Sequence, residues 1–301
     1  MTDQALLQRE PRTSFTTPPG ALLAGPKTIL VHLQSDSTLQ NRLQNALSLA
    51  RASGAHLQCL HVTPAEAYVA YEGLGGLLIM SDAIAAIDDR NAALEARVEM
   101  ELANEDVSWD FIHTTGSIVG SIISHAALAD LIVTGREPQQ AQIMGPSLGF
   151  LGDLISRSRT PVFIPTEDRD SIDPSAPAII AWDGSHAAAD AIRASISLLK
   201  MASAVHVVSV TQGPSEAFPG LLLLKYLSRH GIHAEMSVDP GGTDLSAHNY
   251  VAAVLMEKAA LVGAATIMMG GYNHSRIGEF VFGGVTRTLL SGCTVPLVIA
   301  H

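Results

Sequence analysis

The sequence predicts two doubly wound α/β domains in tandem, each with a five-stranded, mainly parallel sheet. Short apolar segments alternate with amphipathic helical segments along the 301-residue chain. The alternation restarts after a polar segment at 167–176, which contains a proline and no periodicity. The sequences of the two halves can also be aligned with each other, which indicates duplication of a whole domain. Strands that alternate with helices form open sheets with right-handed crossovers.

The first half opens with a βαβ unit. Apolar strands are predicted at 29–33 and 57–62, with a helix near 38–52 between them. Such a crossover joins parallel strands. The remaining elements are predicted, in order, as a charged helix at 84–105, a strand at 107–113, a helix near 118–129, a strand at 131–134, a last helix and a strand at 161–164.

The second half repeats this order in a shorter form. Leu49 aligns with Leu198 at an offset of 149 residues, whereas Gly135 aligns with Gly270 at an offset of 135. The second copy has therefore lost residues between its second and fourth strands, where the first copy has its long charged helix. The predicted organisation is a leader at 1–26, a first domain at 27–166, a linker at 167–176 and a second domain at 177–301.

Composition excludes several classes of partner. A formal charge of −11 with only 18 Lys and Arg disfavours nucleic acid and anionic membrane surfaces. Cys59 and Cys293 belong to no disulfide or zinc pattern, so a reducing cytoplasm is expected. The N-terminus has no signal-peptide pattern. The uncharged stretch 111–129 is interrupted by histidines, glycines and hydroxyl residues and predicts no membrane span.

Candidate binding residues follow strands 1 and 4 of the second half. In doubly wound sheets, ligands bind beyond the carboxyl ends of the strands, where the strand order reverses. Asp183 follows the first strand of this half, Gly270 ends the fourth, and Gly283-Gly284 opens a helix. Glycines allow close backbone approach, and the N–H groups at a helix start can hold an anion such as phosphate. A tight turn without a ligand is the alternative reading of the same pattern.

The spacing of these residues resembles a known signature. Gly270, two residues, Asn273, nine residues and then Gly283-Gly284 is similar to the nucleotide motif of universal stress proteins, Gly-x2-Gly-x9-Gly-Ser/Thr. Asp183-Gly184-Ser185 resembles the family's Asp-Gly-Ser after strand 1. The resemblance covers about 27–165 and 178–301 and implies a Rossmann-like fold in both halves.

The resemblance implies roles for individual residues and a ligand, ATP or AMP. Asp183 would lie by the adenine, and Gly270 and Asn273 would form the ribose and phosphate loop. The residues implied to hold the phosphates are Gly283, Gly284, Val285 and Thr286. The sequence departs from the motif twice, because Asn273 replaces its second glycine and Gly284 replaces its hydroxyl residue. Thr286 is the nearby hydroxyl in this segment.

The first half has lost most of this pattern. At the same offsets, Gly135 persists, but Leu148 stands opposite Gly283 and Gln34 stands opposite Asp183. We therefore expect no nucleotide of the family type in the first domain. The resemblance also implies that the fifth strands, 162–164 and 295–299, lie at edges and pair the two units, and that the protein forms a homodimer through edge strands.

The sequence offers no catalytic or metal-binding constellation. It lacks a P-loop, a dinucleotide fingerprint and a nucleophile elbow around Ser185, which is read as a turn or N-cap residue. His56 and His61 are five apart on a strand and face opposite sides. The first functional hypothesis is a cytoplasmic stress-response regulator that binds an adenine nucleotide in its second domain. A dimeric interaction scaffold without ligand is the second, and a slow ATP hydrolase is the third.

Overall fold

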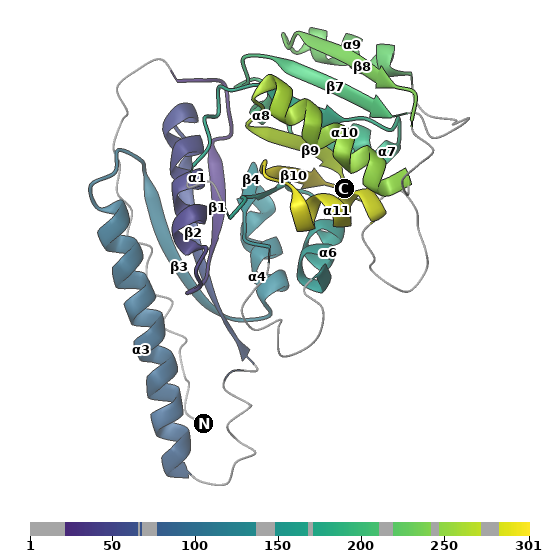
Figure 1. The fold of residues 1–301 in the computed structure, drawn as a ribbon. Coiled ribbons are helices and arrows are strands. Elements are labelled where there is room, and N and C mark those ends of the chain that lie inside the picture. The colour runs from purple at the N-terminus through teal and green to yellow at the C-terminus, as the bar shows by residue number, and fades with distance from the viewer. Residues whose placement is uncertain are drawn as a thin grey trace.

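The computed structural model describes residues 22–65, 67, 77–136, 148–167, 171–210, 219–241, 247–271 and 283–301. These residues form one continuous ten-stranded sheet with helices on both faces (Figure 1). The predicted α/β class with mainly parallel strands is confirmed. The boundaries proposed for the two domains stay a prediction, and we keep them as names for the two halves.

The first half contains five strands in the order predicted. They are β1 (Thr28–Leu33), β2 (His56–Pro64), β3 (Trp109–Gly116), β4 (Leu131–Val133) and β5 (Val162–Ile164). The helices between them are α1 (Leu39–Ser53), α3 (Leu77–Leu102), α4 (Ile118–His125), the 3-10 helix η2 (Ala126–Leu128) and α6 (Leu148–Arg157).

The second half repeats the arrangement. Its strands are β6 (Ala178–Ala181), β7 (Val205–Val210), β8 (Ala234–Asp239), β9 (Thr266–Gly270) and β10 (Leu297–Ala300). Its helices are α7 (His186–Ala194), α8 (Ile196–Leu199), α9 (Gly220–Arg229), α10 (Ala247–Val262) and α11 (Gly284–Gly292).

The two halves join through their fifth strands. The strand order is β3-β2-β1-β4-β5-β10-β9-β6-β7-β8, so each half has the order 3-2-1-4-5 read from its outer edge. All pairings are parallel within the described sheet except β5 with β10, where Phe163 lies opposite Val298 in an antiparallel register. The predicted pairing of the units through their fifth strands is confirmed.

Two apolar cores lie on the two faces of the sheet, and each spans both halves. On one face, α1 and α3 of the first half share a cluster with α7, α8 and α9 of the second. On the other face, α4 and α6 share a cluster with α10 and α11. Because both cores are continuous across the β5–β10 seam, burial stabilises the two halves together.

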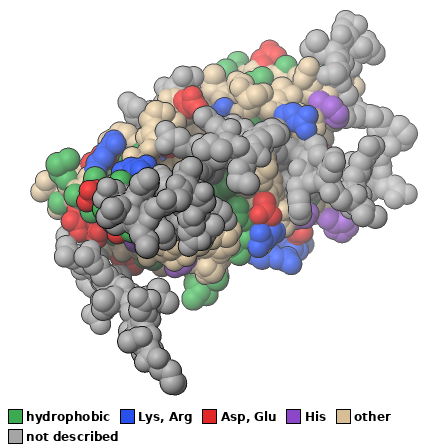
Figure 2. Space-filling view, turned by 90° about the horizontal axis from the view of Figure 1, so that it is seen from below, with side chains coloured by type: hydrophobic (Ala, Val, Ile, Leu, Met, Phe, Trp, Pro, Cys, Tyr) green, Lys and Arg blue, Asp and Glu red, His purple; other side chains and the backbone are tan. Residues whose placement is uncertain are grey.

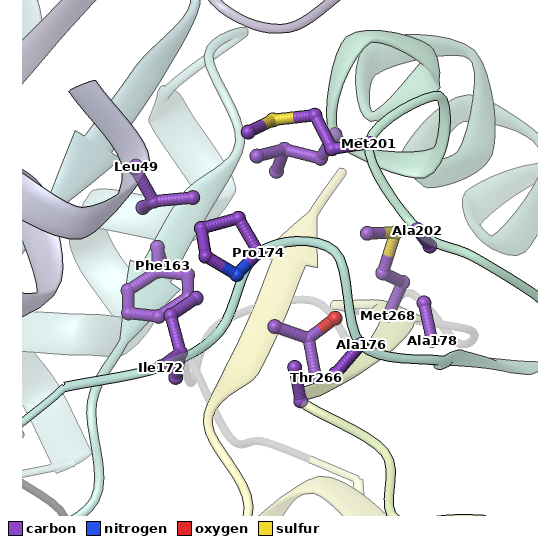
Figure 3. A pocket seen from close by; sticks show the side chains of 12 residues that line it. Leu49, Phe163, Ile172, Pro174, Ala176, Ala178, Met201, Ala202, Thr266 and Met268 are labelled. Atoms are coloured by element: carbon purple, nitrogen blue, oxygen red, sulfur yellow. The ribbon is translucent and has the colours of Figure 1, made fainter. Parts of the chain in front are cut away.

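The connection between the halves packs against the sheet. Ile172 is only 7 % exposed, although the segment looked like a plain polar linker. Figure 3 shows Pro174 between Phe163 and Leu49 of the first half and Met201 of the second, around a small apolar cavity. Ala178 and Thr266, the first residues of β6 and β9, line the same cavity. It therefore lies away from the carboxyl ends of β6 and β9, where doubly wound sheets bind ligands.

Candidate functional site

The candidate site of the second domain begins at two adjacent strand ends. Asp183 comes two residues after β6, and Gly270 is the last residue of β9. Since β6 and β9 pair in parallel, with Ile180 opposite Met268, both residues lie at the same edge of the sheet. The strand order reverses between these two strands, which makes this edge the crevice of the doubly wound fold.

Asp183 and Ser185 shape the turn from β6 into α7. The exposed Asp183 accepts a hydrogen bond from the Ser185 backbone N–H at 2.9 Å, around Gly184 at φ +76°. Ser185 is the N-cap of α7, and its Oγ accepts from the Ala188 N–H at 3.1 Å. The predicted turn or N-cap role of Ser185 is confirmed. A place for Asp183 beside an adenine stays a prediction, because its turn geometry arises without a ligand.

Gly270 has a packing reason to be glycine. A Cβ on this residue would lie 2.7 Å from the backbone C of Ala187 and 2.7 Å from the backbone N of Ala188. The start of α7 thus rests directly on the end of β9, and any side chain at this position would push the helix away. The glycine is therefore explained by contact between helix and strand and is not by itself a sign of a ligand.

The N-terminus of α11 is the part of the site that the fold leaves open. Gly283 is the N-cap, is exposed, and has φ −55°, a value that any residue adopts. A Cβ there would meet no atom within 4 Å. Neither backbone conformation nor packing within the described residues therefore accounts for this glycine. Helix geometry leaves the first backbone N–H groups of α11 without intrahelical acceptors, and a glycine N-cap supplies no side chain to cap them.

The residues after Gly283 lie against α10. A Cβ on Gly284 would lie 2.3 Å from the His248 ring, so His248 borders this end of α11. Asn249 accepts a hydrogen bond from the Thr288 hydroxyl at 3.1 Å. Thr286 is 4 % exposed and packs into the helix interface, while Val285 is half-buried. The phosphate-binding roles implied for Gly284, Val285 and Thr286 stay predictions.

Charge at this end of α11 favours an anion. The first turn contains no acidic residue, and Arg287 is exposed beside it. The partial positive charge of a helix N-terminus adds to this attraction. Sequence reasoning missed His248 and Arg287: His248 lies on α10, far from the motif in sequence, and Arg287 lies outside the motif spacing. Asn273 lies outside the described residues.

In the first domain, a buried arginine occupies the corresponding region. Arg42 is 1 % exposed, and its Nε and Nη2 donate to the carbonyls of His32 and Gln34 at the end of β1. Nη1 pairs with Asp36 at 3.0 Å and donates to the Thr38 hydroxyl. Burial lowers the pKa of the Arg42 guanidinium, and the Asp36 carboxylate opposes that shift.

Arg42 also reaches the glycine that both halves share. A Cβ on Gly135, the counterpart of Gly270, would lie 2.7 Å from Arg42 Nη1. At the offset of 149, Arg42 corresponds to Ala191, so the second domain has only a methyl group where the first has a guanidinium. The arginine thus occupies part of the switch-point crevice of the first domain with the chain's own hydrogen bonds, and a small cavity lined by Arg42, Gly135 and Arg136 lies beside it.

Histidines on three adjacent strands are paired inside the protein. His32 is 3 % exposed, lies 3.2 Å from the Thr134 hydroxyl through Nδ1, and has a pKa lowered to about 3 by burial and by Arg42. His61 stacks on His113 with ring centroids 5.2 Å apart, and burial lowers the pKa of His113. His61 lies 2.9 Å from Asn91 of α3 through Nε2. These contacts give the histidines structural roles.

The described residues include two cysteines and possible metal ligands. Cys59 and Cys293 are buried, and burial raises the pKa of the Cys59 thiol. Over the described ranges, no three His, Cys, Asp or Glu side chains are grouped so as to hold a metal ion. Within the same ranges, none of the helices has both the length and the hydropathy needed to span a bilayer. Figure 2 shows acidic and basic side chains interspersed over the described part of one face.

Comparison with protein families gives a match to part of the chain. Residues 26–158 match the model of the Universal stress protein family. This part of the chain is similar to a universal stress protein domain. The whole chain, with its ten-stranded sheet, fits a tandem member of this family. No curated protein matches the sequence.

Solved structures show the same fold over nearly the whole chain. A universal stress protein from Archaeoglobus fulgidus is 15 % identical with a TM-score of 0.63, and the match covers 91 % of this chain and 95 % of that one. A functionally unknown protein from Pseudomonas aeruginosa PAO1 is 16 % identical with a TM-score of 0.55, covering 91 % and 92 %. A putative universal stress protein from Pseudomonas aeruginosa UCBPP-PA14 is 15 % identical with a TM-score of 0.52, covering 91 % and 93 %. At these identities the likeness concerns the fold.

Proposed function

We propose that this universal stress protein is a cytoplasmic stress-response regulator that binds one adenine nucleotide, ATP or AMP, in its second domain. The observation that carries the proposal is Gly283 at the start of α11, a glycine that neither backbone conformation nor packing requires among the described residues, and that caps the helix with no side chain. A phosphate could approach the backbone N–H groups of the helix at Gly283, which has no side chain of its own. Asp183 and Gly270 lie at the strand ends of the same domain, where a base and a ribose would bind.

The first domain contributes no second site in this proposal. Its crevice is partly occupied by Arg42, whose guanidinium is bound by carbonyls and by Asp36. A nucleotide would have to displace these buried hydrogen bonds before it could enter. The expected stoichiometry is therefore one nucleotide per chain.

The proposal is tested by titrating the full chain with ATP and with AMP, each with and without Mg²⁺, by calorimetry. Gly283→Val is the decisive variant, because its side chain would project into the proposed phosphate position, where a Cβ meets no atom of the described residues within 4 Å. We expect at least a tenfold loss of affinity, equivalent to about 1.4 kcal/mol. Gly292→Ala is the matched control, since Gly292 lies at the other end of α11 and also has open space around a Cβ.

Two results would contradict the proposal. If the wild-type chain shows no saturable binding at millimolar nucleotide, the interaction-scaffold hypothesis takes its place. If Gly283→Val binds as tightly as Gly292→Ala, the nucleotide lies elsewhere. Hydrolysis above background that is lost on changing Asp183 or Thr286 would instead support the ATP hydrolase hypothesis.

We also propose that the protein forms a homodimer through edge strands, and the topology limits which edges are available. β5 and β10 pair with each other, so β3 and β8 are the two edges of the described sheet. A dimer formed by β8 would be broken by Val238→Pro, because proline removes a backbone donor and disfavours pairing at that strand. Light scattering coupled to size exclusion measures the mass directly, and a monomer at all concentrations would contradict this part of the proposal.

A further inference from the structure

Arg136 belongs to the first domain but binds a helix of the second. It follows β4 (Leu131–Val133) and comes directly after Gly135. Its Nη1 donates a hydrogen bond to the carbonyl of Leu290, and its Nη2 donates to the carbonyl of Cys293 at 3.1 Å. Leu290 lies in the last turn of α11 and Cys293 is the C-cap residue. The guanidinium therefore caps the C-terminus of a helix in the other half of the molecule.

This contact meets a need that α11 does not meet with its own residues. The last four carbonyls of a helix lack intrahelical donors, and the C-terminus has a partial negative charge. The last turn of α11 contains no basic residue. Hydrogen bonds from a charged donor are roughly twice as strong as neutral ones. Arg136 supplies both the donors and the charge from across the domain boundary.

The arrangement runs in one direction only. At the offset of 135, Arg136 corresponds to Gly271. A Cβ on Gly271 would lie 2.7 Å from Ile155 Cγ2 of α6, so a long side chain has no room there. The helix α6 has its own basic residue, Arg157, in its last turn. The first domain thus caps a helix of the second, whereas Gly271 has no side chain with which to cap α6 in return.

The helix that Arg136 caps is the one that presents the candidate phosphate site. α11 has 9 residues and spans about 13 Å at 1.5 Å per residue. Thr286, Leu289 and Leu290 are at most 4 % exposed, so the buried face of α11 runs along its length. A short helix that is packed along one face moves as a rigid unit. A displacement of its C-terminus therefore also displaces its N-terminal turn.

We propose that Arg136 is a positioning residue through which the first domain fixes the N-terminal turn of α11 and so sets the nucleotide affinity of the second domain. The part of this inference that concerns nucleotide affinity rests on the proposed function. The position of the N-terminal turn can be tested without any ligand. The first domain, which has no nucleotide site in this proposal, would then support the nucleotide site of the second domain.

The test compares three variants of the full chain with wild type. Arg136→Met removes the charge and the donors but keeps most of the length, and Arg136→Lys keeps the charge without the fork of donors. Arg157→Met is the control, because Arg157 is a half-exposed arginine that pairs with Asp153 on its own helix. Hydrogen exchange of α11 amides is measured first, and ATP affinity second.

We expect Arg136→Met to raise exchange of the Arg287 amide, the first of α11 with an intrahelical acceptor (the Gly283 carbonyl), about tenfold. It should also weaken ATP binding about tenfold, because the hydrogen bonds from a charged donor to α11 are lost. Arg136→Lys should restore part of both changes, and Arg157→Met should match wild type. Exchange in β1 and β2 should not change, which distinguishes positioning from general destabilisation.

Two outcomes would overturn the inference. One is Arg136→Met with wild-type exchange at the Arg287 amide, including the case in which only the C-terminal turn of α11 exchanges faster. The other is unchanged ATP affinity in Arg136→Met when wild type binds ATP. If wild type binds no nucleotide, the proposed function fails while the exchange data still decide whether Arg136 positions the helix.

Discussion

At the scale of single residues, the two halves differ most in the side chain that meets the strand-4 glycine. In the first domain this is Arg42, whereas in the second domain the nearest atoms to a Cβ on Gly270 are backbone atoms of Ala187 and Ala188. The loss of motif residues in the first half was visible in the sequence. The burial of Arg42 was not visible in the sequence, because an arginine in a helical segment is normally exposed to solvent.

We expect Arg42→Met to lower the free energy of unfolding by about 3 kcal/mol, because one partner of a buried ion pair is removed while Asp36 and two carbonyls lose their donors. Urea denaturation measures the change. Arg157→Met, at an exposed pair, should change stability by less than about 1 kcal/mol. Equal effects from the two variants would show that Arg42 is no more than a surface arginine.

His32 makes stability depend on pH. Its pKa in the folded protein is about 3, below the ordinary value of 6.5, so the unfolded chain binds a proton more readily. Stability is therefore full above pH 6.5 and falls as the pH drops toward 3, by at most about 1.4 kcal/mol per pH unit for this group. His113, whose pKa is also lowered, contributes in the same direction.

This dependence should be smaller in His32→Asn, which retains a polar atom near Thr134. Denaturation midpoints measured between pH 7.5 and pH 5 (roughly the upper part of the range in which histidine titrates) give the difference. The exposed His233→Asn serves as control. A pH slope in His32→Asn as steep as that of wild type would contradict the assignment.

At the scale of elements, the order of strands and helices could be predicted from the sequence. The contacts between these elements could not. Alternation of buried strands and amphipathic helices places β1, α1 and β2 within a few residues of their predicted bounds. The helix predicted at 84–105 begins at Leu77, because the prediction followed its charged residues and not its apolar start. Gly270 was interpreted as a ligand residue, but its contact with α7 needs three-dimensional information.

The close contact between α7 and β9 makes Gly270 sensitive to any side chain. We expect Gly270→Ala to cost about 1–3 kcal/mol, as overpacking against backbone atoms does. Chemical denaturation of this variant and of Gly292→Ala provides the comparison, since a Cβ on Gly292 meets nothing within 4 Å. Unchanged stability in Gly270→Ala would mean that the glycine has a role other than packing.

At the scale of the whole molecule, the continuous sheet and the two shared cores make the halves one folding unit. Each core cluster contains residues of both halves. The protein has 2 tryptophans, Trp109 on β3 and Trp182 after β6, so each half has its own fluorescent probe. We expect Trp109→Phe and Trp182→Phe to unfold with coincident fluorescence and circular dichroism transitions. Separate midpoints for the two halves would contradict a shared core.

The central claim is an asymmetry: two copies of one domain, of which the second binds an adenine nucleotide and the first is closed by its own arginine. A crystal structure of the full chain grown with millimolar ATP and Mg²⁺ tests this claim most directly. We predict ordered nucleotide density beside Gly283 at the start of α11, with Arg42 still bound to the carbonyls of His32 and Gln34. Density in the first domain with Arg42 displaced, or an empty second domain at saturating nucleotide, would contradict it.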